Sequence, residues 1–261
     1  MTARITTRRD GEIATVELDN PPKLNALTLS MWEELARVMR ELSDSEDLRC
    51  VVLRGAGQQA FAAGADIAEF ATVRNTRDQG ETYHRRYVHG ALLAVAECRH
   101  PTVALIQGPC VGGGLEIACQ CDIRIAGASA RFGVPINRLG FPIAYDELEA
   151  VLPVIGRAAA LEMLLEGRVW DAREAYDKGL LARVVADETV EEEAYATARR
   201  IAEGAPLAAR WNKQMIRRLA PGAPALTEQE RKDNFRYFET EDYRIGYEAF
   251  MEKRKPKFTG R

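Results

Sequence analysis

The sequence is poor in histidine, in paired cysteine motifs and in long apolar runs. Its three histidines, His84, His89 and His100, form no HExxH or similar cluster, so zinc catalysis is not expected. Its five cysteines are odd in number and irregularly spaced, and Cys119-Gln-Cys121 is not a CxxC pair. We therefore expect free, mostly buried thiols in a reducing compartment and no metal site. No stretch approaches the ~20 apolar residues that a membrane-spanning helix needs.

The sequence also lacks an excess of basic residues and an apolar signal segment. Lysine and arginine number 36 and aspartate and glutamate 39, which leaves a formal net charge of −3. The sequence pI near 5.8 is far from the basic character expected of a nucleic-acid binder. The N-terminus carries arginines and threonines but no apolar signal core. We expect a cytoplasmic protein that binds neither nucleic acid nor membrane.

What the sequence does contain is typical of a folded enzyme-sized chain. It has 261 residues, of which 46% are hydrophobic and 29% charged, both ordinary globular values. In the first part of the chain, short apolar runs alternate with stretches of helical period. Strands are predicted at 12–19, 49–54, 102–107 and 122–126, and helices from 28 to 42, at 83–98 and at 114–121. Such alternation predicts right-handed βαβ units and a largely parallel sheet.

The chain becomes mainly helical after about residue 150. One strand is predicted at 182–185, and the helices are predicted at 157–166, 171–178, 189–203, 206–218 and 227–239. The sequence thus predicts an α/β core over 1–200 and a helical C-terminal region over 201–261.

A glycine-rich turn is the strongest local signal. The segment Gly108-Pro-Cys-Val-Gly112-Gly113-Gly114-Leu-Glu116 follows a predicted strand and opens a predicted helix. Free N–H groups and the positive end of the helix dipole make such a place an anion or oxyanion site. The alternative is a tight turn whose glycines serve packing only.

Glu116 lies in the first turn of that helix, beside Leu115, Ile117 and Ala118. A carboxylate among apolar neighbours is desolvated, which raises its pKa and suits it to general acid/base work near neutrality. The alternative is a glutamate that only complements the helix dipole.

A second glycine-bearing loop, Ala60-Phe-Ala-Ala-Gly64-Ala65-Asp66-Ile67, follows the strand at 49–54. Loops that follow neighbouring parallel strands meet at the same edge of the sheet, where ligands bind. One backbone N–H from each glycine loop would form an oxyanion hole.

Four motifs occur in order and at characteristic distances. They are Asn20-Pro-Pro-Lys-Leu-Asn-Ala26-Leu, Phe61-Ala-Ala-Gly-Ala-Asp66-Ile, Gly108-x3-Gly-Gly-Gly-x-Glu116-x5-Asp122-Ile-Arg-Ile-Ala126, and Ala130-Arg-Phe-Gly-Val-Pro135. This ordered set resembles the crotonase (enoyl-CoA hydratase/isomerase) superfamily, and the match extends from about residue 5 to Lys255. The resemblance implies a spiral core of ββα units with a helical C-terminal region that forms a trimer or a dimer of trimers.

The resemblance also implies acyl-CoA substrates, with coenzyme A as part of the substrate and no other cofactor. It places the oxyanion hole at the N–H groups of Ala65 and Gly113. The adenine and phosphate end of CoA is expected along Lys23, Ala26, Ala63, Asp66 and Ile67, with Phe250 and Lys253 contributed by a neighbouring subunit. The alternative for the two lysines is solvated surface charge.

The sequence departs from the hydratase pattern at the second catalytic acid. Hydratases of the family use two glutamates; the first matches Glu116, whereas the second would follow Pro135, where this chain has Ile136. In the next loop, which contains Tyr145, Asp146 and Glu147, we take Asp146 as the candidate acid. The alternative is that Asp146 caps a helix beginning at Glu147.

Three functions remain open at this point. The first is an enoyl-CoA hydratase with Glu116 as acid/base. The second is an enoyl-CoA isomerase or another crotonase reaction, such as decarboxylation or C–C cleavage, because Ile136 replaces the second glutamate. The third is a CoA-binding protein without catalysis.

Overall fold

A six-stranded sheet in the order β1-β2-β3-β4-β6-β9 forms the centre of the computed structural model, which describes residues 3–220 and 222–261. Only its first pair of strands is antiparallel, and every other neighbouring pair is parallel, as predicted. The strands are β1 (Arg4–Asp10), β2 (Ile13–Asp19), β3 (Cys50–Gly55), β4 (Thr102–Ile106), β6 (Ile123–Gly127) and β9 (Arg183–Val185).

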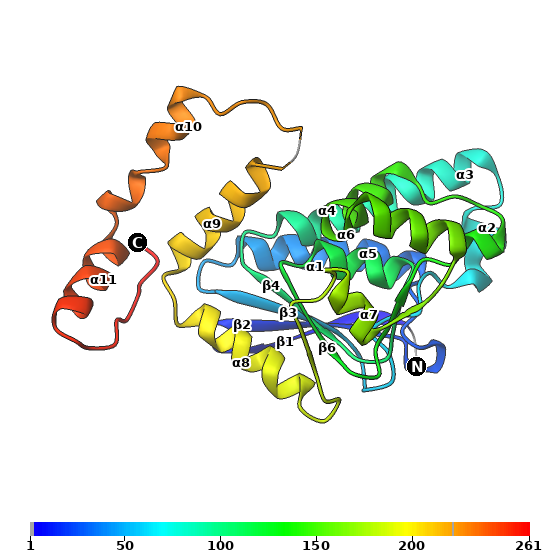
Figure 1. Cartoon of the computed structure of the whole chain (residues 1–261), viewed down its shortest axis with the longest axis horizontal. Helices are drawn as coiled ribbons and strands as arrows, with labels where there is room; N and C mark the ends of the chain where they lie inside the picture. Colours follow the sequence, from blue (N-terminus) through cyan, green and yellow to red (C-terminus); the bar gives the residue numbers. More distant parts are fainter. Residues whose placement is uncertain (1–2, 221) are drawn as a thin grey trace.

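The two faces of this sheet are covered by different helices (Figure 1). On one face, Val51 and Leu53 of β3 belong to the larger apolar core, which contains α1 (Leu29–Asp44), α4 (His89–Glu97) and α5 (Gly113–Gln120). On the other face, Cys50 and Val52 pack in a smaller core with α8 (Val190–Ala202). Successive side chains of a strand point to opposite faces, so a strand covered on both sides is mostly apolar.

Helix α1 illustrates how the sequence determines an element. Its buried residues include Trp32, Leu35 and Met39, which recur at helical spacing. The hydroxyl of Thr28 accepts a hydrogen bond from the N–H of Met31 and thus caps the helix.

A small second sheet connects the two glycine loops. It consists of β5 (Pro109–Val111), β7 (Arg131–Gly133) and β8 (Trp170–Asp171), in that order. Ala62 of the first loop forms an isolated parallel bridge with Cys110 of β5, directly before the triple glycine.

Shorter elements lie around the end of the sheet where the glycine loops meet. They are η1 (Pro21–Lys23), η2 (Ile67–Glu69), α2 (Phe70–Val73), α3 (Arg77–Thr82), η3 (Tyr83–Val88, a π-helical segment), η4 (Ile136–Leu139) and α7 (Ala172–Asp177). Helix α6 (Tyr145–Glu166) crosses this region and contains a break at Gly156, whose φ of 74° is not helical.

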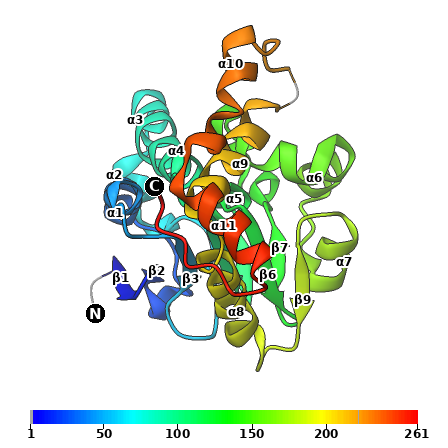
Figure 2. The ribbon, with the colours of Figure 1, turned by 90° about the vertical axis from the view of Figure 1, so that its left-hand side faces the viewer.

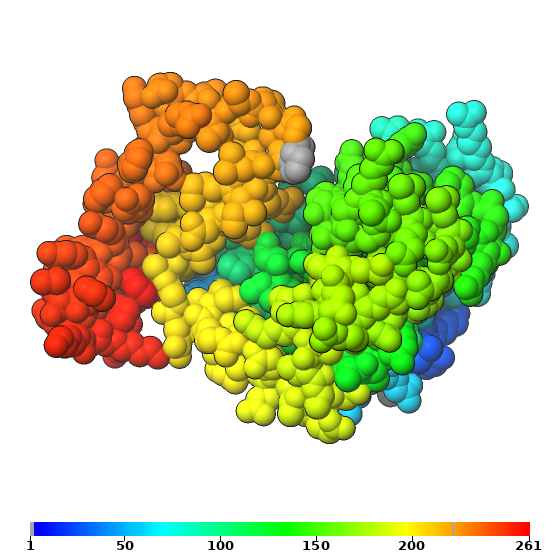
Figure 3. Space-filling view, in the orientation of Figure 1, coloured from blue at the N-terminus to red at the C-terminus, as the bar shows by residue number. Residues whose placement is uncertain are grey.

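The C-terminal part extends from the body of the molecule (Figures 1 and 3). It contains α9 (Pro206–Arg218), α10 (Glu228–Asp233), η5 (Arg236–Glu239) and α11 (Glu241–Met251). In Figure 2, which faces this end, α9 and α11 lie in front of the sheet. Lys213 of α9 holds this part to the body, since its Nζ lies 2.7 Å from Asp122 Oδ2 and 3.0 Å from the carbonyl oxygen of His100.

Most predicted elements are present, and the differences have local causes. The strands β1, β5, β7 and β8 were not predicted, because they are short or polar and acquire their pairing from distant partners. Helix α6 begins at Tyr145 rather than at residue 157, since the chain continues helically on both sides of Gly156. The expected helix over 227–239 is divided into α10 and η5.

No helix in the described parts of the chain is long and apolar enough to cross a membrane.

Candidate active site

The two glycine loops approach each other closely at the start of α5. Gly64 has a φ of +100°, and a Cβ at that position would lie 3.3 Å from the carbonyl oxygen of Val111 and 3.9 Å from the nitrogen of Gly113. Gly112, with a φ of +52°, faces Gly64, since a Cβ added at Gly112 would lie 3.6 Å from the Cα of Gly64. Glycine is needed at both places because side chains rarely adopt this conformation.

Several backbone N–H groups in the described glycine loops have no acceptor, and those of Ala65 and Gly113 are among them. Leu27 donates to the carbonyl oxygen of Gly64 at 2.8 Å and accepts from the N–H of Asp66 at 2.8 Å, so both neighbours of Ala65 are engaged. Gly112 donates to the carbonyl oxygen of Gly133 at 2.8 Å. Within residues 3–220 and 222–261, the N–H groups of Ala65 and Gly113 donate to no acceptor. They lie on facing loops, as an oxyanion hole requires.

Glu116 is buried in the first turn of α5, with an exposed fraction of 4%. Burial raises the pKa of its carboxyl well above the ordinary value, and the charge of Glu147 raises it further. Its carboxyl forms no hydrogen bond with the part of the chain that the structure describes. Its carboxyl therefore has a pKa above the ordinary glutamate value, and no hydrogen bond within the described chain holds it away from a bound molecule.

Glu147, in the first turn of α6, is the second buried carboxyl and has an exposed fraction of 6%. Its Oε1 forms a hydrogen bond and ion pair with Nδ1 of His84, which lies on the π-helical segment η3. Helices α5 and α6 pack together, which brings the first turns that carry Glu116 and Glu147 into one site.

Two buried aromatic side chains, Trp32 and Tyr83, pack beside the start of α5. The Nε1 of Trp32 donates to the hydroxyl of Tyr83 at 3.1 Å, and both residues are buried. The ring of Trp32 lies against Gly113, where a Cβ would come within 2.7 Å of the ring. Burial raises the pKa of Tyr83, so its hydroxyl stays neutral.

The residues that the sequence offered for the second acid lie in different environments. Tyr145 is 87% exposed, and Asp146 is partly exposed and forms no hydrogen bond with any described residue. The structure thus brings Glu147, and not Asp146, to Glu116. The helix-cap alternative for Asp146 is wrong, because α6 begins at Tyr145 and its cap position is Ala144.

The two residues after Pro135 take no part in proton transfer in this arrangement. Ile136 packs against the apolar core, and the amide nitrogen of Asn137 donates to the carbonyl oxygen of Leu165 at 3.0 Å.

Five of the residues expected to bind CoA gather on one edge of the fold. Lys23 Nζ lies 2.6 Å from Asp66 Oδ2, and Asp66 also caps η2 by accepting from the N–H of Ala68 at 3.2 Å. Ala63 donates to the carbonyl oxygen of Leu24 at 2.9 Å, which joins the segment of Lys23 and Ala26 to the loop that ends at Ile67.

The structure does not bring Phe250 and Lys253 to that edge. Phe250 lies on α11 and is 82% exposed, and Lys253 follows the end of the same helix. Helix α11 belongs to the C-terminal part that extends from the body (Figure 1). Within one chain these two residues are therefore separated from Lys23.

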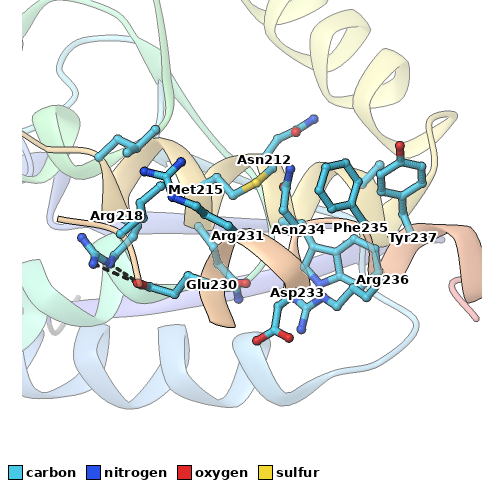
Figure 4. A pocket seen from close by; sticks show the side chains of 15 residues that line it. Asn212, Met215, Arg218, Glu230, Arg231, Asp233, Asn234, Phe235, Arg236 and Tyr237 are labelled. Carbon is cyan, nitrogen blue, oxygen red and sulfur yellow. Dashed lines mark hydrogen bonds and ion pairs between the residues drawn. The ribbon is translucent and has the colours of Figure 1, made fainter. Parts of the chain in front are cut away.

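A cavity between α9 and α10 lies away from this site (Figure 4). It measures about 830 Å³, is lined by Trp211, Met215 and Phe235 among others, and has the ion pair of Arg218 with Glu230, 2.6 Å apart, at its wall. None of the predicted site residues lines it. In residues 3–220 and 222–261, no group of at least three His, Cys, Asp or Glu side chains could hold a metal ion.

Sequence reasoning missed Trp32, Tyr83 and His84 and left Glu147 as one of three possibilities. The available signal was the helical period. Tyr145, Asp146 and Glu147 are consecutive residues at a helix start and lie about 100° apart around its axis, so only one of them faces a given neighbouring helix. The partner of that residue, His84, is distant in sequence and no local pattern identifies it.

Comparisons with known proteins agree with this geometry. Residues 8–261 match the family model described as enoyl-CoA hydratase/isomerase. The "Probable enoyl-CoA hydratase echA8" of Mycobacterium tuberculosis is 37% identical over 260 residues, which cover 98% of each chain. The "Short-chain-enoyl-CoA hydratase" of Clostridium acetobutylicum is 32% identical over 253 residues, 95% of this chain and 94% of its own. The crystal structure of "an enoyl-CoA hydratase/ carnithine racemase" from Magnetospirillum magneticum superimposes with a TM-score of 0.96 at 48% identity, covering 100% of this chain and 97% of that one.

Proposed function

Because the chain belongs to the enoyl-CoA hydratase/isomerase family, we propose that it is an enoyl-CoA hydratase that adds water across a trans-2-enoyl thioester. It is an acyl-CoA-processing enzyme of the crotonase superfamily, a hydro-lyase. The observation that carries the proposal is the pair of buried carboxyls, Glu116 and Glu147, beside two unpaired backbone N–H groups.

The proposed reaction divides the work between the two carboxyls. The carboxylate of Glu147, oriented by His84, accepts a proton from the attacking water while the water oxygen bonds to the β-carbon. The electron pair of the double bond moves toward the thioester, and the oxygen of the resulting enolate accepts hydrogen bonds from Ala65 and Gly113. Glu116, whose raised pKa favours its protonated form, then donates its proton to the α-carbon.

One observation favours isomerisation as a second candidate. Glu147 is engaged with His84, which leaves Glu116 as the carboxyl of the pair without a hydrogen bond in the described chain. A single carboxyl can move a proton between the α- and γ-carbons through the same enolate, and no water is added. Binding of CoA without catalysis is the minor alternative.

We also propose a binding site for the CoA part of the substrate and an oligomeric assembly. Lys23, Ala26, Ala63, Asp66 and Ile67 would bind the adenine and phosphate end of CoA, which is the only cofactor group that we infer. Phe250 and Lys253 would reach it from a neighbouring subunit in a homotrimer or a dimer of trimers. The exposed apolar side chains of the C-terminal part support such an assembly; they include Met215, Ile216, Leu219, Phe235, Phe238, Tyr243, Tyr247, Phe250 and Met251. We infer a cytoplasmic enzyme of fatty acid metabolism with no nucleic-acid or membrane partner.

The test is mass spectrometry of a panel of trans-2-enoyl-CoA thioesters incubated with the protein, once in ordinary and once in heavy water. Gain of one water that is lost in the Glu116→Gln variant supports the hydratase. No gain of water, with deuterium at the α- or γ-carbon, would move the assignment to an isomerase. If no thioester of the panel gains water or deuterium, the proposed catalysis is wrong.

A further inference from the structure

Arg74, at the end of α2, is held between two aromatic rings. The centre of its guanidinium lies 4.1 Å from the centroid of the Phe70 ring and 4.5 Å from that of the Phe141 ring. Phe70 belongs to α2, and Phe141 to the segment between η4 and α6, so two separate parts of the chain supply the rings. Stacking of a guanidinium on aromatic rings is attractive and fixes its plane.

The edge of this guanidinium has no partner. Arg74 is partly buried, yet within the described ranges 3–220 and 222–261 its side chain donates no hydrogen bond and forms no ion pair. Two other arginines with low exposure are paired: buried Arg54 lies 3.0 Å from Glu191, and partly buried Arg124 donates to the carbonyl oxygen of Leu180 at 2.7 Å. A cation that is partly removed from water without an acceptor carries a free-energy cost that a bound anion relieves.

Arg74 adjoins the proposed active site through Tyr83. Its guanidinium lies 5.6 Å from the centroid of the Tyr83 ring, whose hydroxyl accepts from Trp32 at 3.1 Å. The charge of Arg74 lowers the pKa of Tyr83, whereas the charges of Glu116 and Glu147 raise it, although burial is the largest cause. The cation therefore lies beside a tyrosine whose pKa both carboxyls also affect.

The cation is nevertheless not the counterion of the two glutamates. Glu147 pairs with His84, and Glu116 forms no ion pair in the described chain. The pKa of Glu116 is affected by burial and by Glu147, and Arg74 is not among its causes. The unpaired edge of Arg74 thus remains available to a molecule that occupies the site.

We propose that Arg74 binds a carboxylate at the far end of the acyl chain, so that the substrate is the CoA thioester of a dicarboxylic acid. A planar guanidinium binds a carboxylate through two parallel N–H···O bonds. Two rings hold that plane in advance, which reduces the entropy lost on binding. The inference rests on the proposed function in one respect, namely that the thioester oxygen occupies the hole at Ala65 and Gly113.

The test compares trans-2-enoyl-CoA thioesters that end in a carboxylate with thioesters of equal length that end in a methyl group. Arg74→Met is the variant, because methionine keeps a long flexible side chain between the two rings. The matched control is Arg173→Met, since Arg173 also stacks on a ring, that of Tyr176 at 5.8 Å, but on the exposed surface of α7. Thermal unfolding of both variants verifies the fold.

We expect Arg74→Met to lower kcat/KM for the carboxylate series by about 10- to 100-fold, the usual effect of losing a hydrogen bond to a charged group. The methyl series should be unchanged by Arg74→Met, and both series unchanged by Arg173→Met. Equal effects of Arg74→Met on both series would overturn the inference.

Two further measurements separate this inference from the proposed reaction and from the other anion of the substrate. Calorimetric binding of saturated acyl-CoAs of both series requires no turnover; weaker binding of the carboxylate series alone to Arg74→Met supports the inference even if no water is added. Thioesters of 3′-dephospho-CoA test the phosphate as the anion. Suppose that Arg74→Met no longer lowers kcat/KM or affinity once the 3′-phosphate is removed, but still lowers them for thioesters without an acyl carboxylate. Arg74 then binds CoA and the inference is wrong.

Discussion

The charge of Glu147 raises the pKa of Glu116, although the two carboxyls come from the first turns of different helices. Their proximity results from the packing of α6 on α5. Where the hydratase pattern places a glutamate directly after the proline, this chain has Ile136, and the second carboxyl enters from the next helix instead. The site can therefore keep two carboxyls even though the sequence motif for the second one is absent.

Substitution of the two neighbouring acids should separate their roles. We expect Glu147→Gln to lower kcat for hydration by about 10²- to 10⁴-fold, the usual contribution of a general acid or base. Asp146→Asn should leave kcat within about twofold, since it changes a side chain without a partner in the described chain. The measurement is the initial rate of loss of the enoyl-thioester absorbance. The reverse order of effects would return the role to Asp146.

His84 should act on the reaction through Glu147. Because Nδ1 of His84 binds the carboxylate, we expect His84→Ala to lower kcat by about tenfold and to leave KM nearly unchanged, the cost of losing a charge-assisted hydrogen bond. His84→Asn keeps an N–H donor near the position of Nδ1 and should restore much of the rate. A purely structural role would instead give the same loss in both variants together with a lower thermal midpoint.

The parallel sheet could be predicted because its strands are buried on both faces. Every residue of β3 is buried and its first four are apolar, and β4 is likewise buried along its whole length with four apolar residues. Strand β1, by contrast, has mostly exposed polar residues and is ordered by its antiparallel pairing with β2. No local pattern in Arg4–Asp10 reports that pairing, so sequence analysis could not find it.

The residues of the candidate site also differ in whether a local sequence pattern reveals them. The glycine loops and Glu116 were found because backbone requirements leave a sequence signature, a glycine where φ is positive or where two loops approach. The contact of Glu147 with His84 and the stacking of Arg74 leave none. They depend on how α6 and η3 are placed in three dimensions, which local spacing does not encode.

The oxyanion hole is tested more cleanly at Ala65 than at Gly113. A side chain at Gly113 would come within 2.7 Å of the Trp32 ring, so its substitution would disturb packing as well as the N–H. The N–H of Ala65 has no acceptor in the described chain, so Ala65→Pro removes a donor without breaking a hydrogen bond of the fold. We expect kcat to fall by about 10²- to 10³-fold.

Ala65→Ser provides the matched control for that experiment, because it alters the side chain and keeps the N–H. It should retain most of the activity. If Ala65→Pro unfolds at the temperature of the parent protein and remains active, the N–H of Ala65 does not bind the thioester oxygen.

The pH dependence of stability should reveal the raised pKa of Glu116. An ordinary glutamate has a pKa of 4.5, and burial holds the folded-state value well above it. Between these two values the folded protein binds more protons than the unfolded chain, so this group lowers the free energy of unfolding as pH rises. Below the ordinary pKa both states are protonated and the contribution is absent.

Glu116→Gln removes this contribution, because glutamine is neutral at every pH. The variant should therefore gain stability relative to the parent as pH rises above 4.5, by about 1.4 kcal/mol per pH unit until the folded-state pKa is reached. Urea unfolding of both proteins across this range, at one protein concentration, measures the difference. Glu33→Gln is the control for removing a carboxyl from an exposed position, since Glu33 is exposed on α1. A difference for Glu116→Gln that is flat or falls with pH would mean that Glu116 is ionised in the folded protein, and its assignment as the proton donor would then be wrong.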